Sequence, residues 1–418
     1  MADTLNGNLS LILSYKSDIK SAIEAKGVDM TGVPLSGYAD AIGSISGGGG
    51  GGGFTLKQIA ERSYFSAQLN DSTISFVMPY AFRGNYYSSD FYSYVTPMIT
   101  SVSLENCSVV YTHGFEYNVE LSYLNLPNCT YVGEGAFFGC TSLTDVHLDK
   151  CITVDERAFQ TCINLSTINL PSCTYISTNA FNACASLVSV SLPVCTYIGD
   201  YAFSGLGSLQ SVYAPNCAST GAYAFYGCVG LSSIDFPGCD TVGVAAFSNC
   251  IGLTSVSLPL CKTVGGSAFY DCLNLSTIDL PSCLAIGAQA FRNLHLETIS
   301  LPLCTEIGAG AFNGCSLISS ISLPEVTSLG GTVFYNCSSL VYVYLPKCQA
   351  IGGQAFRNCT SLSEVYLLNT DSVCTLGDSR VFSGVLDYKV YVPSTLYNDY
   401  LVAQYWSQIT ARIYSVEV

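Results

Sequence analysis

Apolar and polar residues alternate in short stretches that recur along most of the chain. From Val188 to Leu192, two valines and a leucine alternate with two serines. A period of two is typical of a β-strand with one buried face. Pro193 follows this stretch, and proline ends a strand because it has no N–H to donate. The pattern therefore predicts one short, half-buried strand in each recurrence.

The strand pattern belongs to a longer repeat, which is easiest to follow on phenylalanine. Phenylalanines stand 22 residues apart from Phe137 to Phe291, one interval of 21 leads to Phe312, and the spacing of 22 then resumes to Phe356. The unit reads L-x-x-V/I-x-L-P-x-C-x-x-I-G-x-x-A-F-x-x-C. One such unit cannot bury its apolar side alone, so neighbouring units must stack. The sequence predicts a mostly β solenoid with a stack of parallel strands.

A glycine follows the first cysteine of most units by four residues, as at Gly133, Gly199 and Gly243. Glycine is favoured where the chain turns sharply or passes close to a neighbour. Both needs are expected once per turn of a solenoid.

The repeat unit closely resembles the BspA-like leucine-rich repeat of bacterial surface proteins. The resemblance covers about residues 99–384, with a degenerate first turn at 72–82. The segment 389–413 also resembles the C-terminal ending of such arrays, and we expect it to form a last strand, Pro393 and an amphipathic helix that carries Trp406. This ending would cap the exposed final turn.

The first 46 residues follow a different pattern. Apolar residues in 4-3 spacing predict an amphipathic helix for oligomerisation or attachment, and they are Leu5, Leu9, Ile12, Ile19 and Ile23. The alternative is a helical hairpin that folds back onto the solenoid. The wording of 15–45 resembles the N-terminal attachment modules of bacteriophage tail-fibre and other structural proteins. That resemblance implies binding to other virion (tail or baseplate) proteins.

These patterns divide the chain into five predicted parts. They are a helical module at 1–46, a polyglycine linker at 47–53, an N-terminal cap with a tyrosine-rich insertion at 54–98, the solenoid at 99–384 and a C-terminal cap at 385–418.

The 21 cysteines fall mostly into two rows, one just after the strand and one three residues after phenylalanine. Leu206 and Leu294 replace cysteine in the second row, and Val326 does so in the first. A small buried apolar group can be replaced in this way, whereas a metal ligand cannot. We therefore expect buried thiols and no metal site, with some disulfides as the alternative.

The net charge and the absence of known motifs restrict the classes of function that the chain can have. The net charge of −15 argues against nucleic acid and anionic membranes, which bind basic surfaces. No apolar run is long enough to insert into a membrane. There are only 3 histidines, and no catalytic or nucleotide-binding motif is found. We expect no enzymatic activity and no cofactor.

Tyrosines gather near the two ends of the array, and large, rigid aromatic side chains suit recognition of a host cell-surface glycan or protein. The candidate receptor-binding residues are Tyr80, Tyr86, Tyr87, Phe91, Tyr92 and Tyr94 in the insertion, and Tyr342, Tyr344, Glu364 and Tyr366 on late strands. The alternative is that tyrosine merely covers a β surface. Outward residues of the middle strands are mostly Ser and Thr, which would suit an inert spacer.

The leading hypothesis is a phage tail-fibre or receptor-binding protein, a homo-oligomer for which a trimer is one arrangement, located in the virion and outside the cell after lysis. The alternatives are a bacterial BspA-like surface adhesin and a structural virion spacer. The absence of a basic stretch before the short apolar segment at the N-terminus favours the phage hypothesis, since an adhesin is expected to carry a signal or an anchor.

Overall fold

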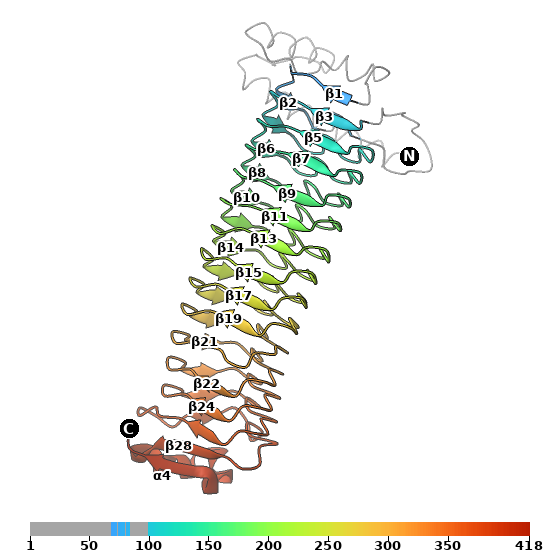
Figure 1. Cartoon of the computed structure of the whole chain (residues 1–418). Helices are drawn as coiled ribbons and strands as arrows, with labels where there is room; N and C mark the ends of the chain where they lie inside the picture. Colours follow the sequence, from blue (N-terminus) through green and yellow to red (C-terminus); the bar gives the residue numbers. More distant parts are fainter. Residues whose placement is uncertain (1–67, 73, 80, 84–98) are drawn as a thin grey trace, which may run out of the picture.

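The computed structural model of this chain describes residues 68–72, 74–79, 81–83 and 99–418. Within these residues the chain winds into one elongated coil, whose C-terminal end carries the short helix α4 (Tyr397–Val402) (Figure 1). Successive turns contribute short strands to two sides of the coil, and the strands of each side pair in parallel. The predicted β solenoid is confirmed. The helix predicted within 1–46 lies outside the described residues.

One side of the coil carries strands that are mostly three residues long and pair in four groups, β1 to β7, β9 to β13, β15 to β19 and β22 to β29. They are β1 (Gln68–Asn70), β3 (Ser101–Ser103), β5 (Tyr123–Asn125), β7 (Asp145–His147), β9 (Thr167–Asn169), β11 (Ser189–Ser191), β13 (Ser211–Tyr213), β15 (Ser233–Asp235), β17 (Ser255–Ser257), β19 (Thr277–Asp279), β22 (Ser320–Ser322), β24 (Tyr342–Tyr344), β26 (Glu364–Tyr366), β28 (Lys389–Pro393) and β29 (Ile413–Val416).

The other side carries two-residue strands that form one 14-stranded sheet. They are β2 (Phe76–Val77), β4 (Val109–Val110), β6 (Tyr131–Val132), β8 (Thr153–Val154), β10 (Tyr175–Ile176), β12 (Tyr197–Ile198), β14 (Ser219–Thr220), β16 (Thr241–Val242), β18 (Thr263–Val264), β20 (Ala285–Ile286), β21 (Glu306–Ile307), β23 (Ser328–Leu329), β25 (Ala350–Ile351) and β27 (Thr375–Leu376).

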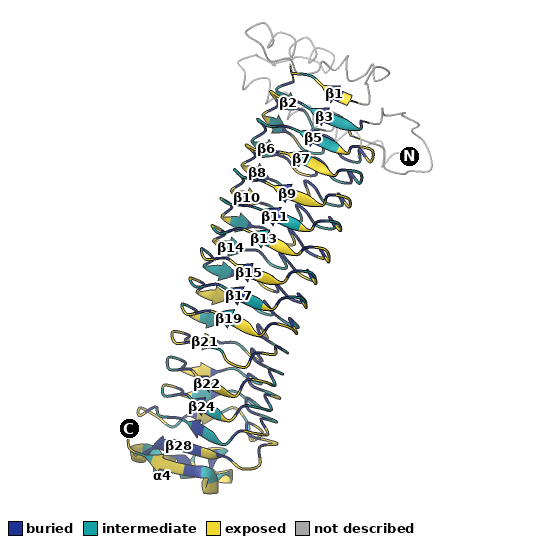
Figure 2. Cartoon of the chain, viewed as in Figure 1, coloured by how far each residue is buried: buried dark blue, intermediate teal, exposed yellow. Residues whose placement is uncertain are grey.

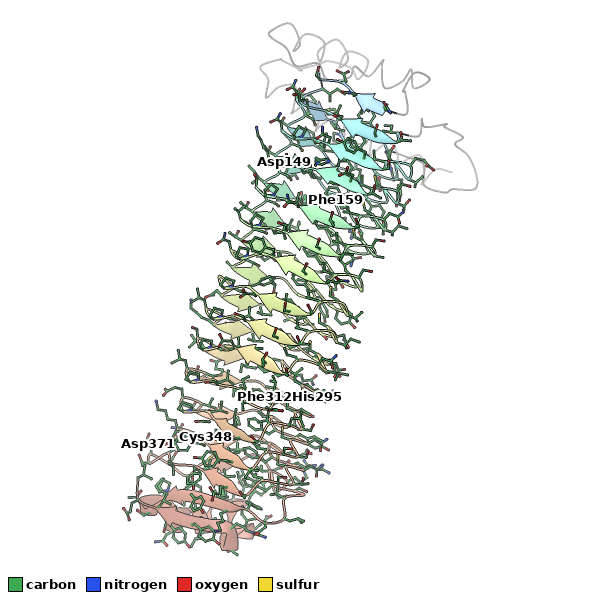
Figure 3. The ribbon with its side chains drawn as sticks, in the orientation of Figure 1. Asp149, Phe159, His295, Phe312, Cys348 and Asp371 are labelled. Atoms are coloured by element: carbon green, nitrogen blue, oxygen red, sulfur yellow. The ribbon has the colours of Figure 1, made fainter. Side chains whose placement is uncertain are left out.

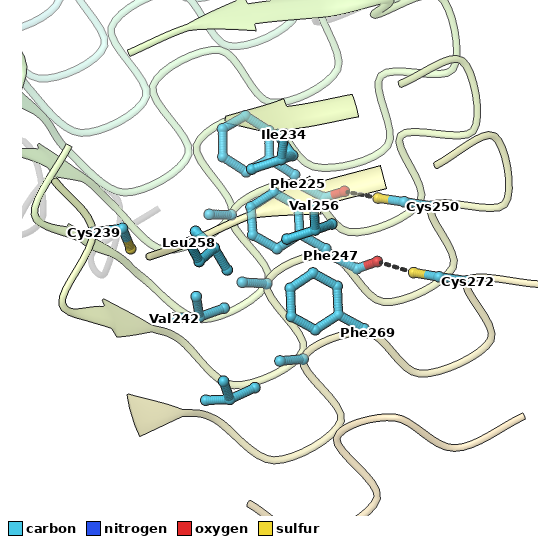
Figure 4. Packing of buried hydrophobic residues seen from close by; sticks show 14 of the residues in the cluster. Phe225, Ile234, Cys239, Val242, Phe247, Cys250, Val256, Leu258, Phe269 and Cys272 are labelled. Carbon is cyan, nitrogen blue, oxygen red and sulfur yellow. Dashed lines mark hydrogen bonds between the residues drawn. The ribbon is translucent and has the colours of Figure 1, made fainter. Parts of the chain in front are cut away.

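The core lies between the two sides and is built from aligned side chains. The middle residue of each three-residue strand points inward, as the buried Val256 does on β17 between two half-buried serines. Figure 2 shows half-buried and exposed residues along the strands of this side. Phenylalanines of successive turns stack along the axis, and the rings of Phe225 and Phe247 lie 5.2 Å apart (Figure 4). Like residues meet in successive turns because nearly all intervals between the stacked phenylalanines are 22 residues long.

The tyrosine-rich insertion leaves this stack unbroken. Phe82 stacks directly on Phe115 with ring centroids 5.0 Å apart, although 33 residues separate them. β2 and β4 pair across the same interval. The turns on either side of the predicted insertion therefore stack directly on each other, and the insertion itself lies outside the described residues.

One predicted strand does not form. The turn that contains Ile299 has no strand at 298–300, and Ile299 is only half-buried. This is the turn with the 21-residue interval between Phe291 and Phe312, which leaves one residue fewer to reach the strand position. His295 lies at the shortened point, on the same level as Phe312 in Figure 3.

The glycines serve close approach rather than a sharp turn. A Cβ on Gly243 would lie 2.3 Å from the carbonyl oxygen of Gly221 in the preceding turn, and a Cβ on Gly199 would lie 2.6 Å from the carbonyl carbon of Ser177. Left-handed turns occur instead two residues before and after the stacked phenylalanine, as at Arg157 (φ 56°) and Thr161 (φ 62°).

The C-terminal cap differs from the predicted strand followed by one helix. α4 ends at Val402, and Trp406 lies in a separate 3-10 turn, η4 (Trp406–Gln408), after Tyr405 adopts a left-handed φ of 64°. The sheet then gains a further strand, β29. Two more 3-10 turns, η3 (Ser394–Leu396) and η5 (Thr410–Arg412), complete the cap. None of the helices in the described part of the chain is long and apolar enough to cross a membrane.

Candidate functional site

The cysteines are structural, and the first row shows why. All 21 are buried and carry free thiols. In the row after the strand, each sulfur donates to the carbonyl oxygen two residues further on, at 3.2 to 3.5 Å. These cysteines are Cys107, Cys129, Cys151, Cys173, Cys195, Cys217, Cys239, Cys261, Cys283, Cys304 and Cys348.

The second row makes bonds between turns. Each sulfur lies 2.9 to 3.3 Å from the carbonyl oxygen of the stacked phenylalanine in the preceding turn, as Cys250 does with Phe225 (Figure 4). The thiol is thus a small apolar group with one weak donor that is used. The sequence patterns did not predict this hydrogen bond between the thiol and the phenylalanine carbonyl of the preceding turn.

Burial also suppresses the reactivity of most of these cysteines, whereas hydrogen bonds from Cys283 and Cys374 lower the pKa of Cys304 and Cys348. Burial raises the pKa of the Cys107 thiol to about 12 and that of Cys129 to about 11, from an ordinary value of 9.0. Because the thiolate is the nucleophile and the metal ligand, these side chains are held in their inert form. No group of three or more metal-ligating side chains occurs among the residues that the structure describes.

The acid and histidine contacts are isolated pairs or small clusters. His147 Nε2 lies 3.0 Å from Asp145 Oδ1 on the exposed face of β7. Near the N-terminal end, Arg83 Nε lies 2.6 Å from the buried Glu116 carboxylate. Burial raises the pKa of Glu116, while the positive charge of Arg83 opposes this shift. Such a neutralised cluster fits a structural role.

The C-terminal strands gather tyrosines on one face. In the sheet register Tyr344, Tyr366, Tyr391 and Tyr414 are successive partners on β24, β26, β28 and β29. The adjacent outward positions on the first three strands hold Tyr342, Glu364 and Lys389. Buried aliphatic residues between these positions hold the tyrosines outward, namely Val343, Val365, Val390 and Ile413. We call these seven outward residues the C-terminal tyrosine face.

The rings of this face pack on one another. Tyr366 and Tyr391 stack with centroids 4.5 Å apart, and Tyr414 lies 5.9 Å beyond Tyr391. Tyr342 packs against Tyr366 at 5.3 Å. Flat ring surfaces are therefore partly used within the face, which leaves ring edges and hydroxyl groups for a partner.

Polar groups complete the face. The Tyr366 hydroxyl donates to Glu364 Oε2 at 3.3 Å, and Lys389 Nζ lies 5.6 Å from the ring centroid of Tyr414. Partial burial, with the nearby Glu364 carboxylate, raises the pKa of Tyr366. The hydroxyl is therefore a protonated donor at neutral pH, suited to hydrogen bonding.

The structure brings together only part of the predicted site. Tyr342, Tyr344, Glu364 and Tyr366 share one face, as predicted from their alternation with Val343 and Val365. Tyr391 and Tyr414 were missed, although Lys389–Tyr391 repeats the alternation of Glu364–Tyr366 and signals the first of them. The candidates in the insertion, from Tyr80 to Tyr94, and the apolar positions from Leu5 to Ile23 lie outside the described residues.

The middle strands are less uniform than the sequence suggested. Their first outward position is mostly Ser or Thr, but the second holds Tyr213, Asp235 and Asp279 on β13, β15 and β19. A shallow groove of about 480 Å³ crosses the outer face of β15, β17 and β19. This part of the surface is therefore not a featureless spacer.

Comparison with known proteins identifies the repeat. The family profile described as BspA type Leucine rich repeat region, with 6 copies, matches residues 108–228, 218–302 and 284–398. No curated protein matches.

Several solved structures are similar to this chain. A leucine-rich repeat protein from Bacteroides ovatus is 23% identical, with 74% of this chain and 88% of that chain covered and a TM-score of 0.49. A leucine rich cell surface protein from Faecalibacterium prausnitzii is 22% identical, with 74% and 95% covered and a TM-score of 0.37. The pneumococcal vaccine antigen PcpA is 16% identical, with 82% and 84% covered and a TM-score of 0.38.

The profile match extends over more than half of the chain, and it coincides with the turns whose phenylalanine, cysteine and strand positions align in the structure. On this basis the chain belongs to the BspA-type leucine-rich repeat family.

Proposed function

We propose that this chain is a non-catalytic binding protein of a bacterial cell surface, an adhesin that recognises a host molecule. The observation that carries the proposal is the C-terminal tyrosine face, where five tyrosines occupy neighbouring outward positions on a rigid sheet. Tyrosine is enriched among the residues that dominate binding energy at interfaces. Family membership supports the surface location, because the repeat resembles that of bacterial surface proteins.

The packing of the rings favours a protein partner over a glycan. A sugar stacks on the flat side of an aromatic ring, and in this face those sides are partly taken by neighbouring tyrosines. Ring edges, hydroxyls, Glu364 and Lys389 offer the mixed apolar and hydrogen-bonding contacts of a protein interface. Because the rings are already ordered by each other, binding costs little side-chain entropy.

The family match also bears on the phage hypothesis. It lies within residues 108–398, so the tail-fibre resemblance rests on the wording of the first 46 residues alone. The match therefore supports the adhesin alternative rather than the leading hypothesis. We propose separately that Leu5, Leu9 and the following apolar positions mediate attachment or self-association.

Changing the tyrosine face should abolish recognition without unfolding the protein. In the variant Tyr344→Ser with Tyr366→Ser, we expect binding to weaken by at least ~30-fold, because one interface hot spot is worth about 2 kcal/mol. The measurement is a titration of the labelled full chain against immobilised extracellular-matrix proteins and against a glycan array.

The matched control is Tyr175→Ser with Tyr197→Ser, which removes a stacked pair with centroids 5.1 Å apart from the 14-stranded sheet. This variant should bind like the unaltered chain. Unchanged binding by the Tyr344 and Tyr366 variant would place the recognition site elsewhere, and preferential binding to glycans would contradict the protein partner.

Removing residues 1–46 should separate association from recognition. If this segment oligomerises the chain through its apolar positions, the shortened protein should be a monomer that keeps its affinity for the immobilised partner. Light scattering gives the mass of both proteins. An unchanged oligomeric state in the shortened chain would show that the solenoid itself associates.

A further inference from the structure

The groove on the middle strands has walls and a floor of different character. Its floor is made by the central residues Ile234, Val256 and Ile278 of β15, β17 and β19, whose side chains point into the core, so the floor is mainly backbone. Its walls are the outward residues on either side, Ser233, Asp235, Ser255, Ser257, Thr277 and Asp279. An elongated ligand can therefore lie across the three strands, along the axis of the coil.

The groove is negatively charged and has no internal counter-charge. Asp235 and Asp279 are exposed, and neither forms an ion pair with a described residue. Elsewhere on the coil some acids are paired across adjacent turns, as Asp240 is with Lys262 at 2.6 Å and Glu325 with Lys347 at 2.7 Å. None of the residues that line the groove is basic. Charge complementarity thus favours a cationic ligand.

Tyr213 extends the groove at its N-terminal end. It occupies the position on β13 that Asp235 occupies on β15, and the pairing of β14 with β16 places these two turns side by side. Tyr213 is 60% exposed, and its ring contacts no other aromatic ring of the described residues. Its flat surface is free, unlike those in the C-terminal tyrosine face.

The spacing of these groups selects one peptide conformation. Neighbouring strands lie ~4.8 Å apart, so Asp235 and Asp279, two strands apart, are separated by about 10 Å along the axis. A polyproline II helix has three residues per turn and a rise of about 3.1 Å, so its residues i and i+3 share a face at about 9 Å. An extended strand repeats on one face every ~6.8 Å and fits less well.

We propose that this groove binds a polyproline II segment of a partner protein with basic side chains at positions i and i+3. The two basic groups pair with Asp235 and Asp279, the serine and threonine hydroxyls hydrogen-bond to the peptide backbone, and Tyr213 contacts a proline ring. A polyproline II backbone leaves its carbonyl groups unbonded, and it docks on aromatic surfaces at low entropic cost.

The test uses the full chain and labelled peptides in a fluorescence anisotropy titration. The probe PPKPPKPP has lysines three apart, and PPKPKPPP has the same composition with lysines two apart. We expect the first peptide to bind with a Kd below roughly 1 mM and at least about fivefold more tightly than the second, and to be displaced by salt, because the contacts are partly exposed ion pairs. The acidic peptide PPEPPEPP should not bind.

Variants assign the contacts. Asp235→Asn and Asp279→Asn should each weaken binding of PPKPPKPP roughly fivefold, and Tyr213→Ala should weaken it while Tyr213→Phe does not. Asp145→Asn is the matched control, because Asp145 lies on the outer face of β7 but outside the groove. Absence of binding, equal affinity for both lysine peptides, or insensitivity to the two aspartate changes would each overturn the proposal. Tighter binding of neutral oligosaccharides in the same groove would overturn it as well.

Discussion

The solenoid is expected to unfold cooperatively as the pH rises from about 9 towards about 10.5, because folding holds most of its thiols protonated. Burial raises the pKa of Cys129, Cys195 and Cys261 to about 11, from an ordinary value of 9.0. It raises the pKa to about 12 at Cys107, Cys173, Cys228, Cys239, Cys272, Cys315 and Cys359.

The direction follows from proton binding. Above pH 9 the unfolded chain loses thiol protons that the folded chain retains, so the unfolded state is favoured as the pH rises. The stabilisation is complete below pH 9 and is lost as the pH approaches the folded pKa. At pH 10 each such thiol loses about 1 kcal/mol of stabilisation, so the set together loses a free energy of the same order as the ~5–15 kcal/mol that stabilises an ordinary domain.

Circular dichroism and thiol alkylation, measured together between pH 7 and pH 11, test this mechanism. Thiols should become reactive at the pH at which the β signal disappears, because native thiols are buried and protonated. Cys140→Leu with Cys359→Leu should raise the midpoint, since Leu206 and Leu294 already occupy this row. If the thiols stay unreactive through the transition, or if these replacements leave its midpoint pH unchanged, another titrating group causes the unfolding.

The sequence predicted those features that depend on the repeat length. The stack of Phe82 on Phe115, with an insertion between them, follows from counting residues between phenylalanines. The lost strand at Ile299 follows from the same count, but only once the structure shows that one missing residue is enough to prevent pairing. Periodicity is informative here because each turn contacts only its neighbours.

The features that were missed depend on contacts outside the repeat. Tyr414 joins the tyrosine face only because the cap carries the chain back to the start of β28, so that β29 pairs with β28 in parallel. Trp406 falls outside the predicted helix because α4 ends at Val402, where Ala403 is extended, and apolar patterning does not reveal this end. The groove depends on both outward positions of β15 and β19. The prediction of a spacer rested on the first outward position alone, which is mostly serine or threonine.

Two side chains of the C-terminal cap form hydrogen bonds with the backbone of Cys374 at the end of the array. Trp406 Nε1 donates to the carbonyl oxygen of Cys374 at 2.6 Å, and the Cys374 N–H donates to the Tyr400 hydroxyl at 2.9 Å. Both aromatic side chains are fully buried. Trp406 also lies 6.2 Å from Phe382, the last ring of the phenylalanine stack. The single tryptophan thus covers the end of the core together with Tyr388, which stacks on Phe382 at 4.9 Å.

Trp406→Ala is therefore expected to unfold the C-terminal turns first. Loss of a buried tryptophan costs ~3–5 kcal/mol, and a buried carbonyl left without a donor adds ~1–3 kcal/mol. In an array where each turn is held by its neighbours, this loss acts at the end of the coil, on β28, β29 and the tyrosines that they carry. Limited proteolysis should cleave near the C-terminus, and binding to the immobilised partner should be lost together with it.

Trp406→Phe separates packing from hydrogen bonding. Phenylalanine keeps an aromatic ring against Phe382 and Tyr400 but cannot donate to Cys374, so a smaller loss of ~1–3 kcal/mol is expected, with the tyrosine face still folded. Because Trp406 is the only tryptophan, its fluorescence in the unaltered chain reports the opening of the cap directly. If Trp406→Ala melts and resists protease like the unaltered protein, the end of the phenylalanine stack does not need this cover, and the sheet pairing of β28 with β29 must stabilise the end alone.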